Sequence, residues 1–152
     1  MRAPGFWVTL LLLSLIGCGR PFRVETPPGM VEIDSEGTYA YRALAPEGVV
    51  VGIRVVDSHR GDLEFWTRAT ELRMRQLNGY ALLGTADVRS RDGTPGRELR
   101  FGHDEKGKPY LYAIRVYVTQ PRLIVVETGG PKEVVVRYQT SLDWMQSSIA
   151  VR

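Results

Sequence analysis

The sequence contains very little cysteine and no long hydrophobic run. Its one cysteine among 152 residues cannot form a disulfide within the chain, so we expect no disulfide framework in the fold. The longest uncharged, mostly apolar run is Phe6–Ile16, about 11 residues, whereas a membrane-spanning helix needs roughly 20. This run is therefore too short to predict a membrane-spanning helix.

Charge of either sign is not concentrated anywhere along the chain. The sequence has 20 Lys and Arg residues against 17 Asp and Glu, a formal net charge of +3 and a pI near 9.2. A basic pI is typical of nucleic-acid-binding domains when the basic residues form a patch or stripe. The charges here are interspersed and no basic run occurs, so we expect no nucleic-acid partner.

The apolar run ends in the tetrapeptide Leu15-Ile16-Gly17-Cys18. A weakly basic start at Arg2 precedes the run, as in secretory signal peptides. The tetrapeptide resembles the lipobox of bacterial lipoproteins, with an aliphatic residue three positions before the cysteine and a small residue directly before it. The resemblance implies signal cleavage between Gly17 and Cys18 and lipidation of Cys18, including palmitate. Gly19 stands where an aspartate would favour the inner membrane, which implies the outer membrane.

Two other interpretations of the cysteine remain open. It could follow an ordinary secretory signal by chance, or lie buried in a core, although the turn-like, polar segment after it disfavours the core. We expect a signal peptide over 1–17, a lipidated cysteine and short tether over 18–23, and one domain over 24–152. Each lipid methylene contributes about 0.8 kcal/mol to membrane binding, so two or three chains would make a permanent anchor.

Turn residues divide the first part of the chain into strand candidates. Proline, glycine and aspartate cluster at Pro27–Gly29 and Asp34–Gly37, as they do in turns. The predicted strands are Phe22–Glu25, Met30–Ile33, Tyr39–Leu44 and Val49–Asp57. The last is apolar at both alternating sets of positions, which predicts a strand covered on both faces.

The clearest predicted helix runs from a cap at Asp62 to Asn78-Gly79. Four charged residues share one solvated stripe at helical spacing, namely Glu64, Arg68, Glu71 and Arg75. Five apolar residues lie on the opposite face, namely Phe65, Trp66, Ala69, Leu72 and Leu77. We expect this apolar face to pack against a sheet.

Four more strands and a terminal helix are predicted after Gly79. The strands are Tyr80–Val88, Gly96–Phe101, Tyr110–Val118 and Leu123–Thr128. The links between them are short and polar, which favours antiparallel hairpins. Pro131 fits the first position of a helix that continues to Ile149, although the run Val134–Val136 favours strand locally. The order of elements predicts the α+β class, with an antiparallel sheet flanked by helices.

Several short motifs contain chemically active residue types but predict no catalysis. Asp57–His59 has the residue types of a triad, yet adjacent side chains point in different directions and cannot form the relay. Imidazole and carboxylates can bind divalent metal, but His103, Asp104 and Glu105 are consecutive on one hairpin tip and encircle an ion poorly. We predict no metal site, no cofactor and no catalytic residue.

Arginine and aromatic side chains supply the candidates for partner binding. Alternation along Tyr110–Val118 places Arg115 and Tyr117 on one face among apolar residues, and Arg73 lies on the apolar side of its helix. Because arginine and aromatics are enriched at interface hot spots, we predict that these three residues contact a partner. The alternative is structural, since arginine stems pack and snorkel and the aromatic pattern is also typical of a core.

The mature chain also resembles a known superfamily. The carrying segments are "FRVETPPGM", the helix ending "NGYALLGTADV", the hairpin region "GTPGRELRFGHDEKGKPYLYAIRVYVTQPRLIVVETGGP" and the terminal helix. They resemble the PsbP-like α/β sandwich, which includes Mog-type proteins and DcrB-type lipoproteins, and small myxobacterial lipoproteins. The resemblance implies a central antiparallel sheet and binding or assembly duties rather than catalysis. The predicted function is a periplasmic, outer-membrane-anchored lipoprotein that docks to an envelope protein, or alternatively a small-ligand or metal carrier.

Overall fold

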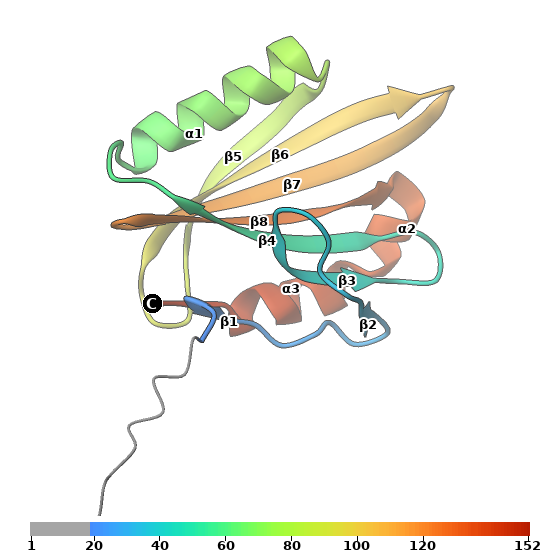
Figure 1. The fold of residues 1–152 in the computed structure, drawn as a ribbon. Coiled ribbons are helices and arrows are strands. Elements are labelled where there is room, and N and C mark those ends of the chain that lie inside the picture. The colour runs from blue at the N-terminus through green and yellow to red at the C-terminus, as the bar shows by residue number, and fades with distance from the viewer. Residues whose placement is uncertain (1–18) are drawn as a thin grey trace, which may run out of the picture.

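The computed structural model describes residues 19–152 and shows a single α+β domain (Figure 1). The predicted lipobox, Leu15-Ile16-Gly17-Cys18, lies outside the described residues. A seven-stranded antiparallel sheet has the order β2-β3-β4-β8-β7-β6-β5. Its strands are β2 (Val31–Glu32), β3 (Tyr39–Leu44), β4 (Val50–Asp57), β5 (Ala81–Arg89), β6 (Pro95–Glu105), β7 (Lys108–Thr119) and β8 (Arg122–Pro131).

Helices cover both faces of this sheet (Figure 1). One face carries α1 (Leu63–Leu72), which continues into the π-helical turn η1 (Arg73–Leu77). The other face carries α2 (Lys132–Arg137) and α3 (Gln139–Ser148). The arrangement is therefore three layers, with the sheet in the middle.

The sheet divides the apolar core into two clusters because successive side chains point to opposite faces. On β8, Leu123 and Val125 belong to the cluster on the α1 side, whereas Ile124 and Val126 belong to the cluster on the α3 side. The same alternation on β7 separates Ile114 from Tyr117. The predicted parity of this strand is confirmed, and both faces of the sheet are buried at β7 and β8. On β4, which was expected to be covered on both faces, Val50 and Val56 are exposed.

The chain ends pair with each other in a second, two-stranded sheet. Strand β1 (Phe22–Arg23) pairs antiparallel with β9 (Ala150–Val151), and the Arg152 N–H donates to the Pro21 carbonyl at 2.9 Å. Phe22 and Val151 are both buried in the cluster on the α3 side. The pairing fixes the first described residues beside the C-terminal residues.

Helix α1 begins directly after its capping residue, Asp62. The Asp62 carboxylate accepts a hydrogen bond from the Phe65 N–H at 2.8 Å, which satisfies one of the free donors of the first turn. Gly79 after η1 has a φ of 70°, a conformation that glycine adopts without strain. The predicted limits of this helix are confirmed, but its last five residues form a π-helical turn.

Three local expectations were wrong. The polar hairpin at Gly102–Pro109 is shorter than expected, since β6 and β7 extend to Glu105 and Lys108 and leave two residues in the turn. Pro131 ends β8, and α2 begins at Lys132. On α1 and η1, Phe65, Leu72 and Leu77 are exposed rather than packed on the sheet.

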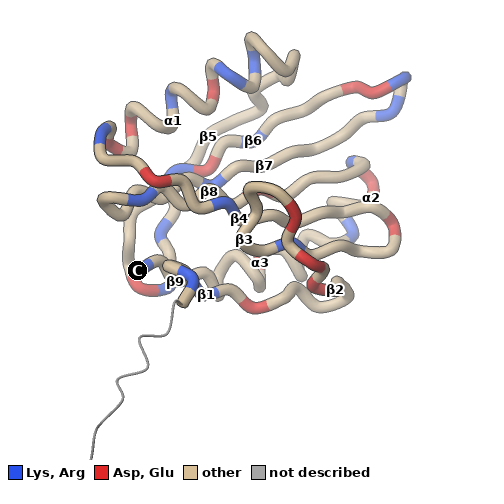
Figure 2. Tube along the Cα trace, viewed as in Figure 1, with Lys and Arg blue, Asp and Glu red and all other residues tan. Residues whose placement is uncertain are grey.

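Basic and acidic residues are interspersed over the trace, as expected (Figure 2).

Candidate binding cavities on the two faces of the sheet

Two cavities lie on opposite faces of the sheet, each between a helix and the strands. The α1 cavity, about 540 Å³, lies between α1 and strands β4, β7 and β8. The α3 cavity, about 500 Å³, lies between α3 and strands β6, β7 and β8. Both volumes are in the usual range for small-molecule pockets, roughly 300–1,000 Å³.

A buried carboxylate organises the α1 cavity. Glu127 on β8 is 6% exposed and forms a close ion pair with the Arg54 guanidinium on β4. Its second oxygen accepts a hydrogen bond from the Tyr39 hydroxyl at 2.8 Å. The sequence permits this because Gly52 pairs with Glu127, and a Cβ at Gly52 would lie 2.5 Å from the Tyr39 ring. The missing side chain makes room for the tyrosine.

The charges in the α1 cavity perturb one another. Burial alone would lower the pKa of the Arg54 guanidinium, but the neighbouring Glu127 carboxylate raises this pKa above its ordinary value. Burial, followed by the negative charge of Glu127, raises the pKa of Tyr112. Burial and the hydrogen bond to Glu127 raise the pKa of Tyr39. Both phenols therefore stay protonated at neutral pH, and the cavity combines apolar side chains with one polar end.

Alkaline pH should destabilise the domain, because burial raises the pKa of Tyr39, Tyr41, Tyr112 and Tyr117. In the unfolded chain these phenols ionise near pH 10. Their contribution to stability is thus full below pH 10 and is lost as pH rises above it, where the unfolded state binds fewer protons. We expect a lower urea midpoint at pH 11 than at pH 8. Tyr112→Phe should reduce the difference, and an equal difference in both proteins would contradict this assignment.

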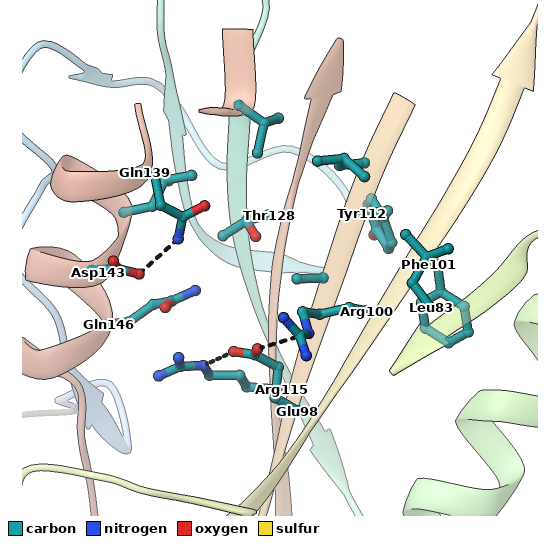
Figure 3. A pocket seen from close by; sticks show the side chains of 14 residues that line it. Leu83, Glu98, Arg100, Phe101, Tyr112, Arg115, Thr128, Gln139, Asp143 and Gln146 are labelled. Atoms are coloured by element: carbon teal, nitrogen blue, oxygen red, sulfur yellow. Dashed lines mark hydrogen bonds and ion pairs between the residues drawn. The ribbon is translucent and has the colours of Figure 1, made fainter. Parts of the chain in front are cut away.

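Polar side chains line the α3 cavity from both the sheet and the helix (Figure 3). The Arg115 Nε donates to Glu98 Oε2 at 2.6 Å, and the Arg100 Nε lies 3.8 Å from Glu98 Oε1. Across the cavity, the Gln139 amide donates to the Asp143 carboxylate at 2.8 Å. Glu98 therefore faces two guanidinium groups, whereas Asp143 on the helix has an amide neighbour.

Solved structures that resemble this architecture include LpqN and a cyanobacterial PsbP. LpqN, described as involved in cell envelope biogenesis of Mycobacterium tuberculosis, matches with a TM-score of 0.68 and 11% identity over 86% of this chain and 82% of LpqN. Cyanobacterial PsbP (CyanoP) of Synechocystis sp. PCC 6803 matches with a TM-score of 0.59 and 15% identity over 93% of this chain and 99% of that one. The chain has a PsbP-like fold. No protein-family profile and no curated protein sequence matches it.

The PsbP-like fold separates the three residues predicted to bind a partner. Arg73 is exposed on η1 and borders the α1 cavity. Arg115 lines the α3 cavity on the opposite face of the sheet, with its side chain 17% exposed. Tyr117 is fully buried at 0% exposure, so its side chain packs in the core and has no surface with which to contact a partner.

The hairpin motif of the PsbP-like domain holds no cluster of metal ligands. The His103 ring stacks on Tyr80, with 4.8 Å between the ring centroids, and among residues 19–152 no group of three or more His, Cys, Asp and Glu side chains could hold a metal ion. Within the same range, no helix is both long and apolar enough to cross a membrane.

The site residues that sequence reasoning missed are Glu127, Arg54 and Tyr39 in the α1 cavity and Gln146 in the α3 cavity. A partial signal existed for Glu127, because a carboxylate at an inward position of a buried strand needs a partner. The partners themselves, Tyr39 and Arg54, come from β3 and β4. Strand β3 pairs with β4, and β4 pairs with β8, which carries Glu127.

Proposed function

We propose that this chain is a non-catalytic lipoprotein of the bacterial cell envelope, anchored through Cys18 in the outer membrane and facing the periplasm. Its PsbP-like domain docks onto another envelope protein. The lipobox motivates the anchor, and the similarity to LpqN, a protein involved in cell envelope biogenesis, supports the envelope. The observation that carries docking is the exposed apolar side of α1.

The outer face of α1, defined as Phe65, Arg68 and Leu72 with Ala69 and the first η1 residue, Arg73, at its edge beside the α1 cavity, combines apolar and basic side chains. Phe65 is 56% exposed and Leu72 is 42% exposed, and no residue of α1 is fully buried. Large apolar side chains grouped on one helix face mark interaction surfaces more often than scattered ones do. Aromatic residues and arginine are also the side chains enriched at hot spots.

Charge indicates the chemistry of the partner. Arg75 is paired with Glu71 at 3.0 Å, but no ion pair within residues 19–152 involves Arg68 or Arg73. These two guanidinium groups flank the apolar residues and remain available. The partner surface we propose is therefore apolar at its centre and acidic at its rim, on a protein of the same membrane.

The proposed function predicts the result of affinity purification from detergent-solubilised envelopes. Native protein should carry lipid on the peptide that begins at Cys18 and should co-purify with a specific partner. Cys18→Ser should abolish lipidation and leave an uncleaved precursor. Leu72→Glu should keep the anchor but reduce co-purification at least about tenfold, because it places a desolvated charge in the centre of the interface.

The matched control is Val136→Glu. Val136 is as exposed as Phe65 but lies on α2, across the sheet, so this variant should retain the partner. An unmodified cysteine in the mature chain would disprove the anchor. Equal recovery of the partner with Leu72→Glu and Val136→Glu would disprove docking through the outer face of α1.

A second function, a carrier of a small ligand, is favoured by one specific observation. Polar side chains from the sheet and from α3 converge on the α3 cavity (Figure 3). Convergent polar groups in a partly apolar pocket are typical of ligand sites. Because this cavity lies across the sheet from the outer face of α1, the two functions are compatible.

A further inference from the structure

Two polar side chains with little overall exposure line the α3 cavity. Gln146 on α3 is 7% exposed and Thr128 on β8 is 6% exposed. Gln146 projects from the helix into the cavity (Figure 3). Within residues 19–152, neither side chain takes part in a hydrogen bond, although the neighbouring Gln139 and Arg115 do. Neither Gln146 nor Thr128 is among the side chains of residues 19–152 that hold an enclosed N or O atom without a partner, so their polar atoms reach the open space of the cavity. They are therefore available to a polar ligand there.

The positive charge of Arg115 indicates which chemical group of a ligand the α3 cavity binds. Only its Nε is used by Glu98, and its two terminal nitrogens have no partner among residues 19–152. In Figure 3 they point toward the side of the cavity from which Gln146 projects. A guanidinium with two free N–H groups in a fixed plane matches a carboxylate in a bidentate pair. The Gln146 amide can add a third donor.

The opposite end of the cavity favours a cation. Asp143 lies one turn before Gln146 on α3 and, among residues 19–152, accepts only from the Gln139 amide. The charged lining residues are Glu98, Arg100, Arg115 and Asp143, so their formal charges cancel. A ligand with net charge would disturb this balance, whereas a ligand with a negative and a positive end would preserve it. Leu111, Val135 and Leu142 give the walls between the ends an apolar character.

We infer that the α3 cavity binds a small zwitterion, a molecule with a free α-carboxylate and an amine. Arg115 and Gln146 hold the carboxylate, and Asp143 accepts from the ammonium group. The chemistry is shared by free amino acids and short peptides, and the apolar walls favour small aliphatic side chains. This binding is independent of the docking surface on α1 and goes beyond it.

The inference predicts calorimetric binding to the full chain in lipid nanodiscs. The probes are L-alanine and tri-L-alanine, of which at least one should bind at one site per chain. Binding of tri-L-alanine alone would indicate a peptide ligand, and binding of L-alanine a free amino acid. For the probe that binds, amidation of its carboxylate or acetylation of its amine should weaken affinity about tenfold or more, the usual effect of losing a hydrogen-bonded charge.

Two variants link the binding to the cavity. Arg115→Gln and Gln146→Leu should each weaken affinity about tenfold. Gln146→Leu removes no hydrogen bond within residues 19–152, so it keeps the test valid even if Arg115→Gln fails to fold. Leu72→Glu should bind the probe normally. This variant therefore distinguishes a failure of the ligand-binding inference from a failure of the proposed docking through α1. The inference is overturned if neither probe binds, if the amidated probe binds equally well, or if Gln146→Leu has unchanged affinity.

Discussion

Substitution of Glu127 by alanine is expected to lower the free energy of unfolding by about 3 kcal/mol, the range found when one partner of a buried ion pair is removed. Glu127 is the acceptor for both Arg54 and Tyr39. Without it, the guanidinium, whose side chain is only 27% exposed, and the phenol lose their shared acceptor. The Arg54 Nε is already buried without a partner among the described residues, so the guanidinium has few alternatives.

The measurement is urea denaturation of Glu127→Ala beside two reference variants. Glu127→Gln retains an acceptor for the Tyr39 hydroxyl and should lose less. Glu71→Ala removes an exposed pair with Arg75 and should cost only about 0.3–0.5 kcal/mol. If Glu127→Ala and Glu71→Ala have the same small effect, Glu127 does not hold the α1 cavity together.

Tyr117 should give the second large effect, and its size should depend on which atoms are removed. The ring is fully buried, and a Cβ at Gly96 would lie 2.6 Å from it, so its surroundings are tightly packed. Tyr117→Ala should cost about 3–5 kcal/mol, as expected for a buried aromatic ring. Tyr117→Phe should cost almost nothing, because the hydroxyl is buried with no partner in the part of the chain described.

The pair of variants also separates core packing from partner binding. Tyr117→Phe should co-purify with the envelope partner as well as the native protein does, since the ring does not reach the surface. A cost above about 1.5 kcal/mol for Tyr117→Phe would show that the hydroxyl makes a hydrogen bond, for example through ordered water. Loss of the partner from a stable Tyr117→Phe protein would show that Tyr117 contacts the partner, as the sequence predicted.

Strand faces could be predicted from the sequence, but the face of α1 could not. On β7 the alternation of side chains is a local property of the extended backbone, and it separated Ile114 from Arg115 correctly. The apolar positions of α1 and η1 cover a broad arc, and tertiary packing buries Met74 of η1 and partly buries Leu63 and Trp66 of α1. The π-helical turn η1 then shifts the angular positions of the residues that follow, and Leu77 is exposed.

The two cavities could not be predicted because their groups meet through pairing between distant segments. Arg54 and Glu127 are brought together by the register of β4 with β8, where Gly52 is opposite Glu127. Gln146 comes from a helix and Arg115 from a strand, and both side chains line the cavity on the α3 side of the sheet (Figure 3). Nothing local in either segment specifies the other. The residue types were visible in the sequence, but their combination depends on topology.

The pairing of β1 with β9 limits how the domain can be oriented on a membrane. Phe22 is held in the core, and three residues separate it from Cys18, so the four steps along the chain span at most about 14 Å. If Cys18 carries the proposed lipids, the bilayer lies close to the corner formed by β1, β9 and the end of α3. Because α1 covers the other face of the sheet (Figure 1), it points away from this corner. A domain anchored in this way would thus present α1 outward, to partners that extend beyond the lipid surface.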